Sequence, residues 1–190
     1  MRKASVFGFA AAIVVAAVVG GGCEKSDKVL ASVGEEVLLE SEVERYFREV
    51  KPSLPKSMDK EFAAIKFKEQ ISIGFIDTMT KAEYAKKLGY TMTAEEVAAG
   101  EARIYARAKT EGAVFNSIDE MYAQSPVGKS FARRIFPSAE LVTKMTKAEY
   151  EKSDKSLPPA EFKRELGRRA REAIEYFIDA DLEQPARMEF

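Results

Sequence analysis

The sequence predicts a mainly α-helical fold with a short β-hairpin near its N-terminus. Two short apolar runs, 29–33 and 37–39, flank Gly34-Glu35-Glu36, and apolar runs separated by such a turn are typical of a hairpin. From about Met58 to Leu88, apolar residues recur at spacings of three and four, which places them on one face of a long helix. Helical signals fill most of the remaining chain.

Capping signals mark shorter helices on either side of this long one. Ser41 precedes acidic residues, as an N-cap residue does, and Pro52 ends the helix that Ser41 starts. Thr93 and Glu96 have the spacing of a capping box, and the helix that follows them ends near Gly112. Each of these helices therefore has a start and a stop in its own sequence.

The second half of the chain is less regular. A short capped helix is expected over 117–122, and Pro137 interrupts the next apolar segment, so that a helix begins at Ser138. Residues 153–159 are rich in polar residues and proline and form a linker. The last helix is expected to run from about Ala160 to Leu182. Its core-facing residues are Phe162, Leu166, Ala170, Ala173, Ile174, Phe177 and Ile178.

The first 22 residues have the features of a bacterial export signal. A basic start precedes a long apolar run, and Gly20-Gly21-Gly22 stands directly before Cys23. Small residues before a cysteine resemble a lipobox, which implies that residues 1–22 are removed and that Cys23 carries a lipid. Residues 23–28 then form a polar tether to the membrane.

Ordinary secretion and an uncleaved membrane anchor are the two alternatives. Residues 4–23 form an uncharged run of 20, which is near the minimum length to span a bilayer, although three consecutive glycines weaken a helix there. All three interpretations place the rest of the chain outside the cytoplasm. The expected location is the cell envelope, in the periplasm or at the outer membrane if the source is Gram-negative.

Composition excludes most catalytic chemistry. The chain has no histidine, which removes Ser-His-Asp and Cys-His catalysis and histidine zinc sites. Its one cysteine, Cys23, cannot form an intramolecular disulfide or a cysteine metal cluster. With 30 basic against 31 acidic residues, the charge gives no reason to expect nucleic acid as a partner. We therefore expect no enzyme activity, no metal and no cofactor.

Aromatic residues and methionine are the unusual feature of the composition: 12 Phe, 7 Tyr and 7 Met, with no Trp. Flexible methionines and aromatic rings can form a surface that accepts varied partners, whereas residue type alone favours a core role. The long helix is too apolar to be covered on one side only. We therefore single out Phe67, Phe75, Met79 and Tyr84 on this helix as a candidate groove for client side chains.

Two segments resemble the N-terminal domain of SurA-type periplasmic chaperones. The first contains the two expected strands and enters a helix at Ser41-Glu42-Val43. The second joins the long apolar helix to Leu88-Gly89-Tyr90 and then to Thr93-Ala94-Glu95-Glu96-Val97. The resemblance implies a helical peptide-binding domain over residues 29–152, with a helix in 160–190 that packs back on it.

The chain also departs from this family in two respects. Family members commonly carry a parvulin-type prolyl isomerase module, and this sequence has neither that module nor the histidines of its active site. The turn at Gly34-Glu35-Glu36 stands where the family usually has asparagine and glycine. Isomerase activity is therefore not expected here.

Two hypotheses about function follow. The first is a lipid-anchored holdase that binds unfolded or extended polypeptides, such as outer-membrane proteins, without ATP and without isomerase activity. The second is a structural or adaptor lipoprotein that docks one dedicated envelope partner through a defined interface. An enzyme would need carboxylates that converge in a pocket. The acid pairs Glu35-Glu36 and Glu95-Glu96 lie instead at a turn and a helix start, where solvation and the helix dipole explain them.

Overall fold

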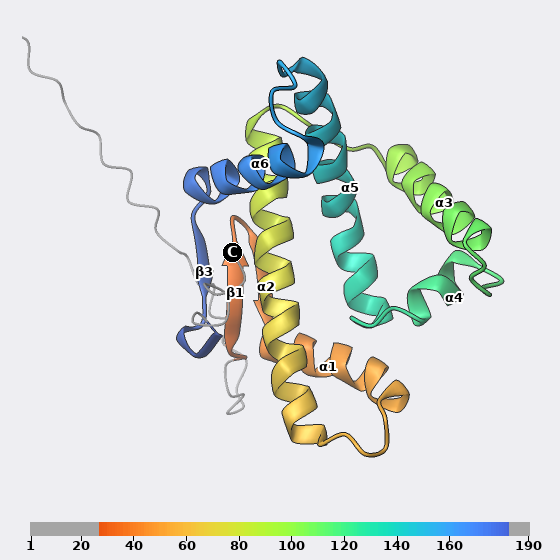
Figure 1. Cartoon of the computed structure of the whole chain (residues 1–190). Helices are drawn as coiled ribbons and strands as arrows, with labels where there is room; N and C mark the ends of the chain where they lie inside the picture. The colour runs from red at the N-terminus through yellow and green to blue at the C-terminus, as the bar shows by residue number, and fades with distance from the viewer. Residues whose placement is uncertain (1–26, 183–190) are drawn as a thin grey trace, which may run out of the picture.

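A computed structural model describes residues 27–182 of the chain. The predicted fold class is confirmed, since the structure is mainly helical with a small antiparallel sheet (Figure 1). The elements are β1 (Val29–Val33), β2 (Glu36–Leu39), α1 (Glu40–Val50), the 3₁₀ helix η1 (Lys51–Ser53), α2 (Lys60–Lys87), α3 (Ala94–Thr110), α4 (Ile118–Ala123), α5 (Lys129–Lys152), α6 (Pro159–Ala173) and β3 (Tyr176–Ile178). The predicted signal segment and Cys23 lie outside the described residues.

The sheet joins the two ends of the described chain. β1 is the central strand and pairs antiparallel with β2 on one side and with β3 on the other. Ser32 is thereby the partner of both Val37 and Phe177. The turn between β1 and β2 places Gly34 at φ 59°, a left-handed backbone conformation that glycine adopts without strain. The predicted hairpin is present, with a third strand added.

The third strand corrects the predicted last helix. That helix was expected to reach Leu182, but α6 ends at Ala173, and Ile174 is extended with φ −123° and ψ 124°. Tyr176–Ile178 then pairs with β1, so long-range strand pairing overrides the helical periodicity of this segment. Ile178 still packs on the core, whereas Phe177 is exposed.

Two helix starts also differ from the sequence-based prediction. α1 begins at Glu40, and Ser41 is not its N-cap, because its backbone N–H and hydroxyl donate to the carboxylate of Asp27. α5 begins at Lys129 and continues through Pro137, where a helix break was predicted. A proline within a helix removes one hydrogen bond. Burial of aromatic and aliphatic side chains on both sides of it compensates, namely Phe131, Phe136, Leu141 and Met145.

The long helix α2 is the centre of the fold. It contacts the sheet, α1, α5 and α6, and it is the yellow helix in the middle of Figure 1. One apolar cluster joins α2 to the sheet and α1, with Leu30, Tyr46 and Phe75 fully buried. A second cluster joins α2 to α5 and α6 through Ala85 and Met145. The apolar faces of α2 are therefore largely used within the chain.

Candidate polypeptide-binding surface

The structure places most of the predicted groove residues inside the core. Phe67, Phe75 and Met79 are buried in the cluster between α2, the sheet and α1, so they are not accessible to a client in this conformation. Tyr84 is half-buried and packs against the second cluster. The wide apolar face of α2 led to this prediction, and the structure covers that face from two sides. These four residues are therefore not carried forward as a binding surface.

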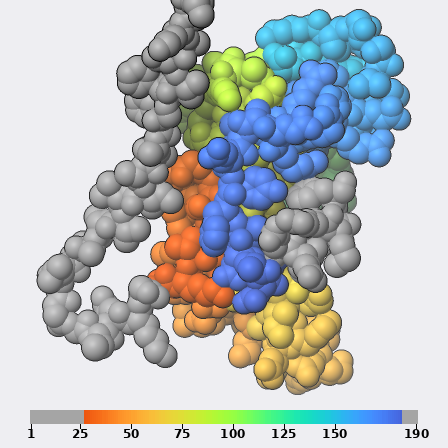
Figure 2. All heavy atoms as spheres, turned by 90° about the vertical axis from the view of Figure 1, so that its left-hand side faces the viewer, coloured from red at the N-terminus to blue at the C-terminus, as the bar shows by residue number. Residues whose placement is uncertain are grey.

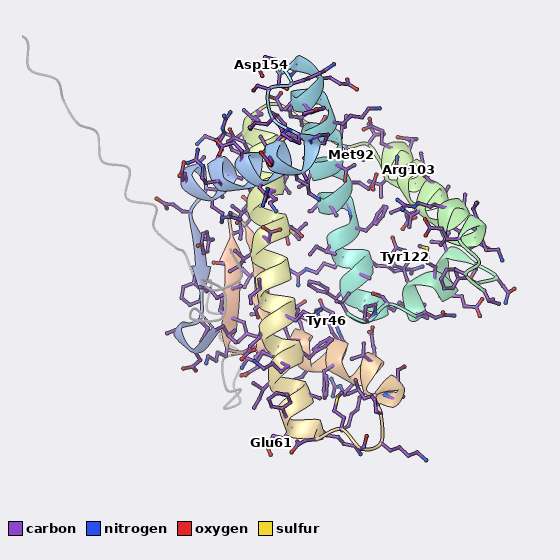
Figure 3. The ribbon with its side chains drawn as sticks, in the orientation of Figure 1. Tyr46, Glu61, Met92, Arg103, Tyr122 and Asp154 are labelled. Carbon is purple, nitrogen blue, oxygen red and sulfur yellow. The ribbon has the colours of Figure 1, made fainter. Side chains whose placement is uncertain are left out.

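One group of exposed apolar residues lies at the start of α2. Met58, just before the helix, is 42% exposed, Phe62 is 59% exposed and Ile65 is 53% exposed. Phe62 and Ile65, three residues apart in α2, lie on one face of the helix, and Met58 precedes the helix by two residues. We call these three residues the apolar tip. The first turn of α2, where Glu61 is labelled in Figure 3, lies at the lower end of the molecule.

An N-cap residue fixes the start of α2 next to the apolar tip. The Asp59 carboxylate caps the helix by accepting hydrogen bonds from the backbone N–H groups of Glu61, at 2.8 Å, and Phe62, at 3.1 Å. The cap fixes where the helix begins and so where Phe62 stands. Figure 2 shows the start of α2, in yellow, extending below the strands. The apolar tip is thus on a formed helix.

A groove between α1 and α2 adjoins the apolar tip at Ile65. Its volume is about 180 Å³. It is lined by Glu40, Val43, Glu44, Phe47, Ala64, Ile65 and Lys68. Phe47 makes a tilted ring contact with buried Phe67, with 5.4 Å between centroids, which fixes the apolar wall of the groove. We call this the α1–α2 groove. It is too small for a drug-sized ligand and suits a single apolar side chain.

Charged residues bound one end of the α1–α2 groove. Lys68 Nζ lies 2.5 Å from a carboxylate oxygen of Glu40, so this pair is formed within the chain. On the other side of the apolar tip, Lys66 Nζ stands 5.9 Å from the ring centroid of Phe62. An apolar surface with charged residues at its border is the usual composition of a protein-binding site.

An open pocket of about 890 Å³ between α2 and α6 has a different character. Several of its charged groups are paired within the chain, such as Asp77 with Lys81 at 2.6 Å and Glu165 with Arg168 at 2.7 Å. Hydrogen bonds from Arg168 and Arg169 lower the pKa of Glu165 to about 2. A carboxylate held ionised in this way is not a general acid at neutral pH. The lining combines these charged side chains with apolar ones, among them Ile73 and Leu157.

Sequence reasoning did not identify the apolar tip. Its signal was present, because Phe62 and Ile65 share a helical face and Met58 stands just before the helix. Nothing in the sequence, however, shows that no other element covers that face. Within residues 27–182, no group of three or more acidic or cysteine side chains is placed to hold a metal ion. In the same part of the chain, no helix is long and apolar enough to cross a membrane.

Comparison with known proteins adds no assignment. The sequence matches no known protein-family profile and no curated protein sequence. The resemblance to SurA-type chaperones therefore stays a prediction, and the functional argument depends on the surface itself.

Proposed function

We propose that this chain is a lipid-anchored, extracytoplasmic chaperone that binds unfolded or extended polypeptides without isomerase activity. The observation that supports it is the exposed apolar tip of Met58, Phe62 and Ile65 beside the α1–α2 groove. Contiguous exposed apolar residues in a soluble domain mark interaction sites. The third residue, Ile65, belongs to both features, so a client could contact them together.

At the apolar tip and the α1–α2 groove, binding would use the hydrophobic effect. An apolar client side chain enters the α1–α2 groove, and its neighbours cover Phe62. Full burial of one large apolar side chain contributes about 1.5–3 kcal/mol. A single site of this size gives weak and reversible binding, which is what a holdase needs to release its clients without ATP.

A lipid on Cys23 would keep this surface near the membrane. Asp27, four residues after Cys23 in the sequence, accepts a hydrogen bond from the backbone N–H of Ser41 at 3.2 Å, at the start of α1. α1 is also one wall of the α1–α2 groove. The described chain therefore begins close to the proposed binding surface, and clients would be held close to the bilayer.

Light scattering of a chemically unfolded protein tests the proposal. The full chain, in nanodiscs of a zwitterionic lipid, should suppress aggregation of two unrelated clients at near-stoichiometric ratios. The double variant Phe62→Ser with Ile65→Ser should lose most of this effect, because it removes the exposed apolar area but no core residue. Val114→Ser, at a residue that is 81% exposed and far from α2 in sequence, is the matched control.

Two results would contradict the proposal. One is the absence of suppression by well-folded protein, and the other is full suppression by the double variant. Suppression or binding restricted to one protein partner would favour the adaptor hypothesis instead.

A further inference from the structure

Four unpaired cations stand together beside the apolar tip. Most Lys and Arg side chains within residues 27–182 form an ion pair with Asp or Glu, and those of Arg48, Lys51, Lys56 and Lys60 are among the minority that do not. The four residues line one surface depression of about 360 Å³, together with Pro52, Leu54 and Pro55. We call this the basic depression. Its cations are exposed and available to an external anion.

The acidic residues close in sequence to these four cations form hydrogen bonds with other groups. Residues 48–60 contain only Glu49 and Asp59 as acids. The Glu49 carboxylate accepts hydrogen bonds from the backbone N–H and the hydroxyl of Ser130 on α5, at 2.9 and 2.5 Å. Asp59 caps α2. Neither carboxylate pairs with a cation of the basic depression, so the depression keeps a positive charge.

The basic depression is formed by the connection between α1 and α2, and it includes one residue from each of the two helices that form the α1–α2 groove. Arg48 directly follows Phe47, and Lys60 precedes Ala64 by one turn. Glu44 in the groove wall and Arg48 in the depression are four residues apart on α1, so they lie on the same face of the helix. Their axial separation is about 6 Å, which about two residues of an extended peptide span. A client that places an apolar side chain in the groove therefore brings its next few residues to the basic depression.

From this charge complementarity we infer that preferred clients are segments in which acidic residues lie two to four positions from an apolar side chain. The inference rests on the proposed function and names its substrate class. Anionic lipid headgroups carry the same charge, but a flat anionic surface needs no groove, and it would also approach the exposed carboxylate of Glu44 in the groove wall. A polypeptide can match apolar and charged features separately.

Fluorescence anisotropy with three peptides tests the inference. The peptides share one apolar core sequence and differ only in flanking residues, which are Asp, Ser or Lys. The full chain in zwitterionic nanodiscs should bind the Asp peptide about fivefold more tightly than the Ser peptide at low salt, and the difference should shrink in high salt. The Lys peptide should bind most weakly.

Charge reversal assigns the effect to the basic depression. The double variant Lys56→Glu with Lys60→Glu should abolish the preference for the Asp peptide and leave binding of the Ser peptide unchanged. The matched control is Lys147→Glu with Lys155→Glu. Both control residues are exposed lysines outside the depression with no acidic partner among the described residues.

The outcomes separate the two proposals. Equal affinity for all three peptides, abolished by Phe62→Ser with Ile65→Ser, overturns the inference and leaves the proposed function in place. No measurable binding of any peptide by folded protein overturns the proposed function itself. Binding to nanodiscs that contain anionic lipid, lost in the Lys56→Glu and Lys60→Glu variant, together with no preference for the Asp peptide, overturns the inference in favour of membrane docking.

Discussion

Gly100 determines how closely α3 can approach α5. A Cβ atom at this position would stand 2.7 Å from Oε2 and 2.9 Å from Cδ of Glu140. Glu140 is buried, and its carboxylate accepts a hydrogen bond from Arg103 at 2.6 Å. Any larger residue would displace this carboxylate and weaken the attachment of α3. Gly100 is the only buried residue of α3, so the helix is attached mainly through polar contacts.

Alanine substitutions at two glycines should therefore have different effects on the free energy of unfolding. Gly74→Ala, in α2, should raise the free energy of unfolding by about 1 kcal/mol, because open space surrounds the new methyl group and alanine favours a helix. Gly100→Ala should leave it unchanged or lower it by up to about 2 kcal/mol, since displacement of Glu140 offsets the helical gain. Urea denaturation measures both. Equal stabilisation by the two variants would show that Glu140 moves freely.

Glu165 should make stability depend on pH. Its pKa is lowered to about 2 by hydrogen bonds from Arg168 and Arg169. A lowered carboxyl pKa contributes stability that is fully present above the ordinary value of 4.5 and is lost as the pH falls toward 2. Glu165→Gln should therefore flatten the fall in stability between these values, most clearly at low salt. Glu151→Gln, at an exposed acid, should not. An unchanged slope in Glu165→Gln would contradict this account.

At the scale of elements, local signals predicted the boundaries that capping determines and missed those that tertiary contacts determine. The capping box at α3 is formed, with the backbone N–H of Thr93 donating to Glu96 at 2.9 Å and that of Glu96 donating to Thr93 at 3.2 Å. Such signals act within one turn of helix. The strand after α6 could not be found in this way, because pairing with β1, more than 140 residues earlier, decides its conformation. Continuity of α5 through Pro137 likewise depends on packing against other helices.

Pro137 offers a direct test of that explanation. The proline is exposed, so Pro137→Ala loses no buried contact and restores a backbone N–H donor inside α5. The free energy of unfolding should rise by about 1–3 kcal/mol. Pro159→Ala is the control, because proline is well tolerated in the first turn of a helix and Pro159 begins α6. Destabilisation by Pro137→Ala would mean that the proline itself is required by the fold.

The candidate site likewise depends on both the local sequence pattern of α2 and the elements that pack on it. Apolar spacing placed Phe67, Phe75 and Met79 on one face of α2, and they do share a buried cluster. Periodicity identifies the apolar face of a helix but not which part of it another element covers. The sheet and α1 cover these residues and leave Phe62 and Ile65 exposed. Exposure, which decides what can bind, came only from the structure.

At the scale of the whole molecule, the residues that stabilise the fold differ from those of the proposed binding surface. α2 provides the core along most of its length and presents the apolar tip at its first turns (Figure 1). Substitutions at the tip should therefore change binding with little effect on unfolding. The basic depression lies at the same end, between α1 and α2. The apolar tip and the basic depression would thus bind a client at the same end of α1 and α2.

Photocrosslinking tests the central claim most directly. Benzoylphenylalanine is introduced in place of Phe62 or, as a control, Val114, and each full-length protein is irradiated with two unrelated unfolded clients. We expect efficient crosslinks from position 62 with both clients and few from position 114, although Val114 is the more exposed of the two residues. Crosslinks of equal yield from both positions, or none from position 62, would contradict the assignment of the apolar tip as the polypeptide-binding surface.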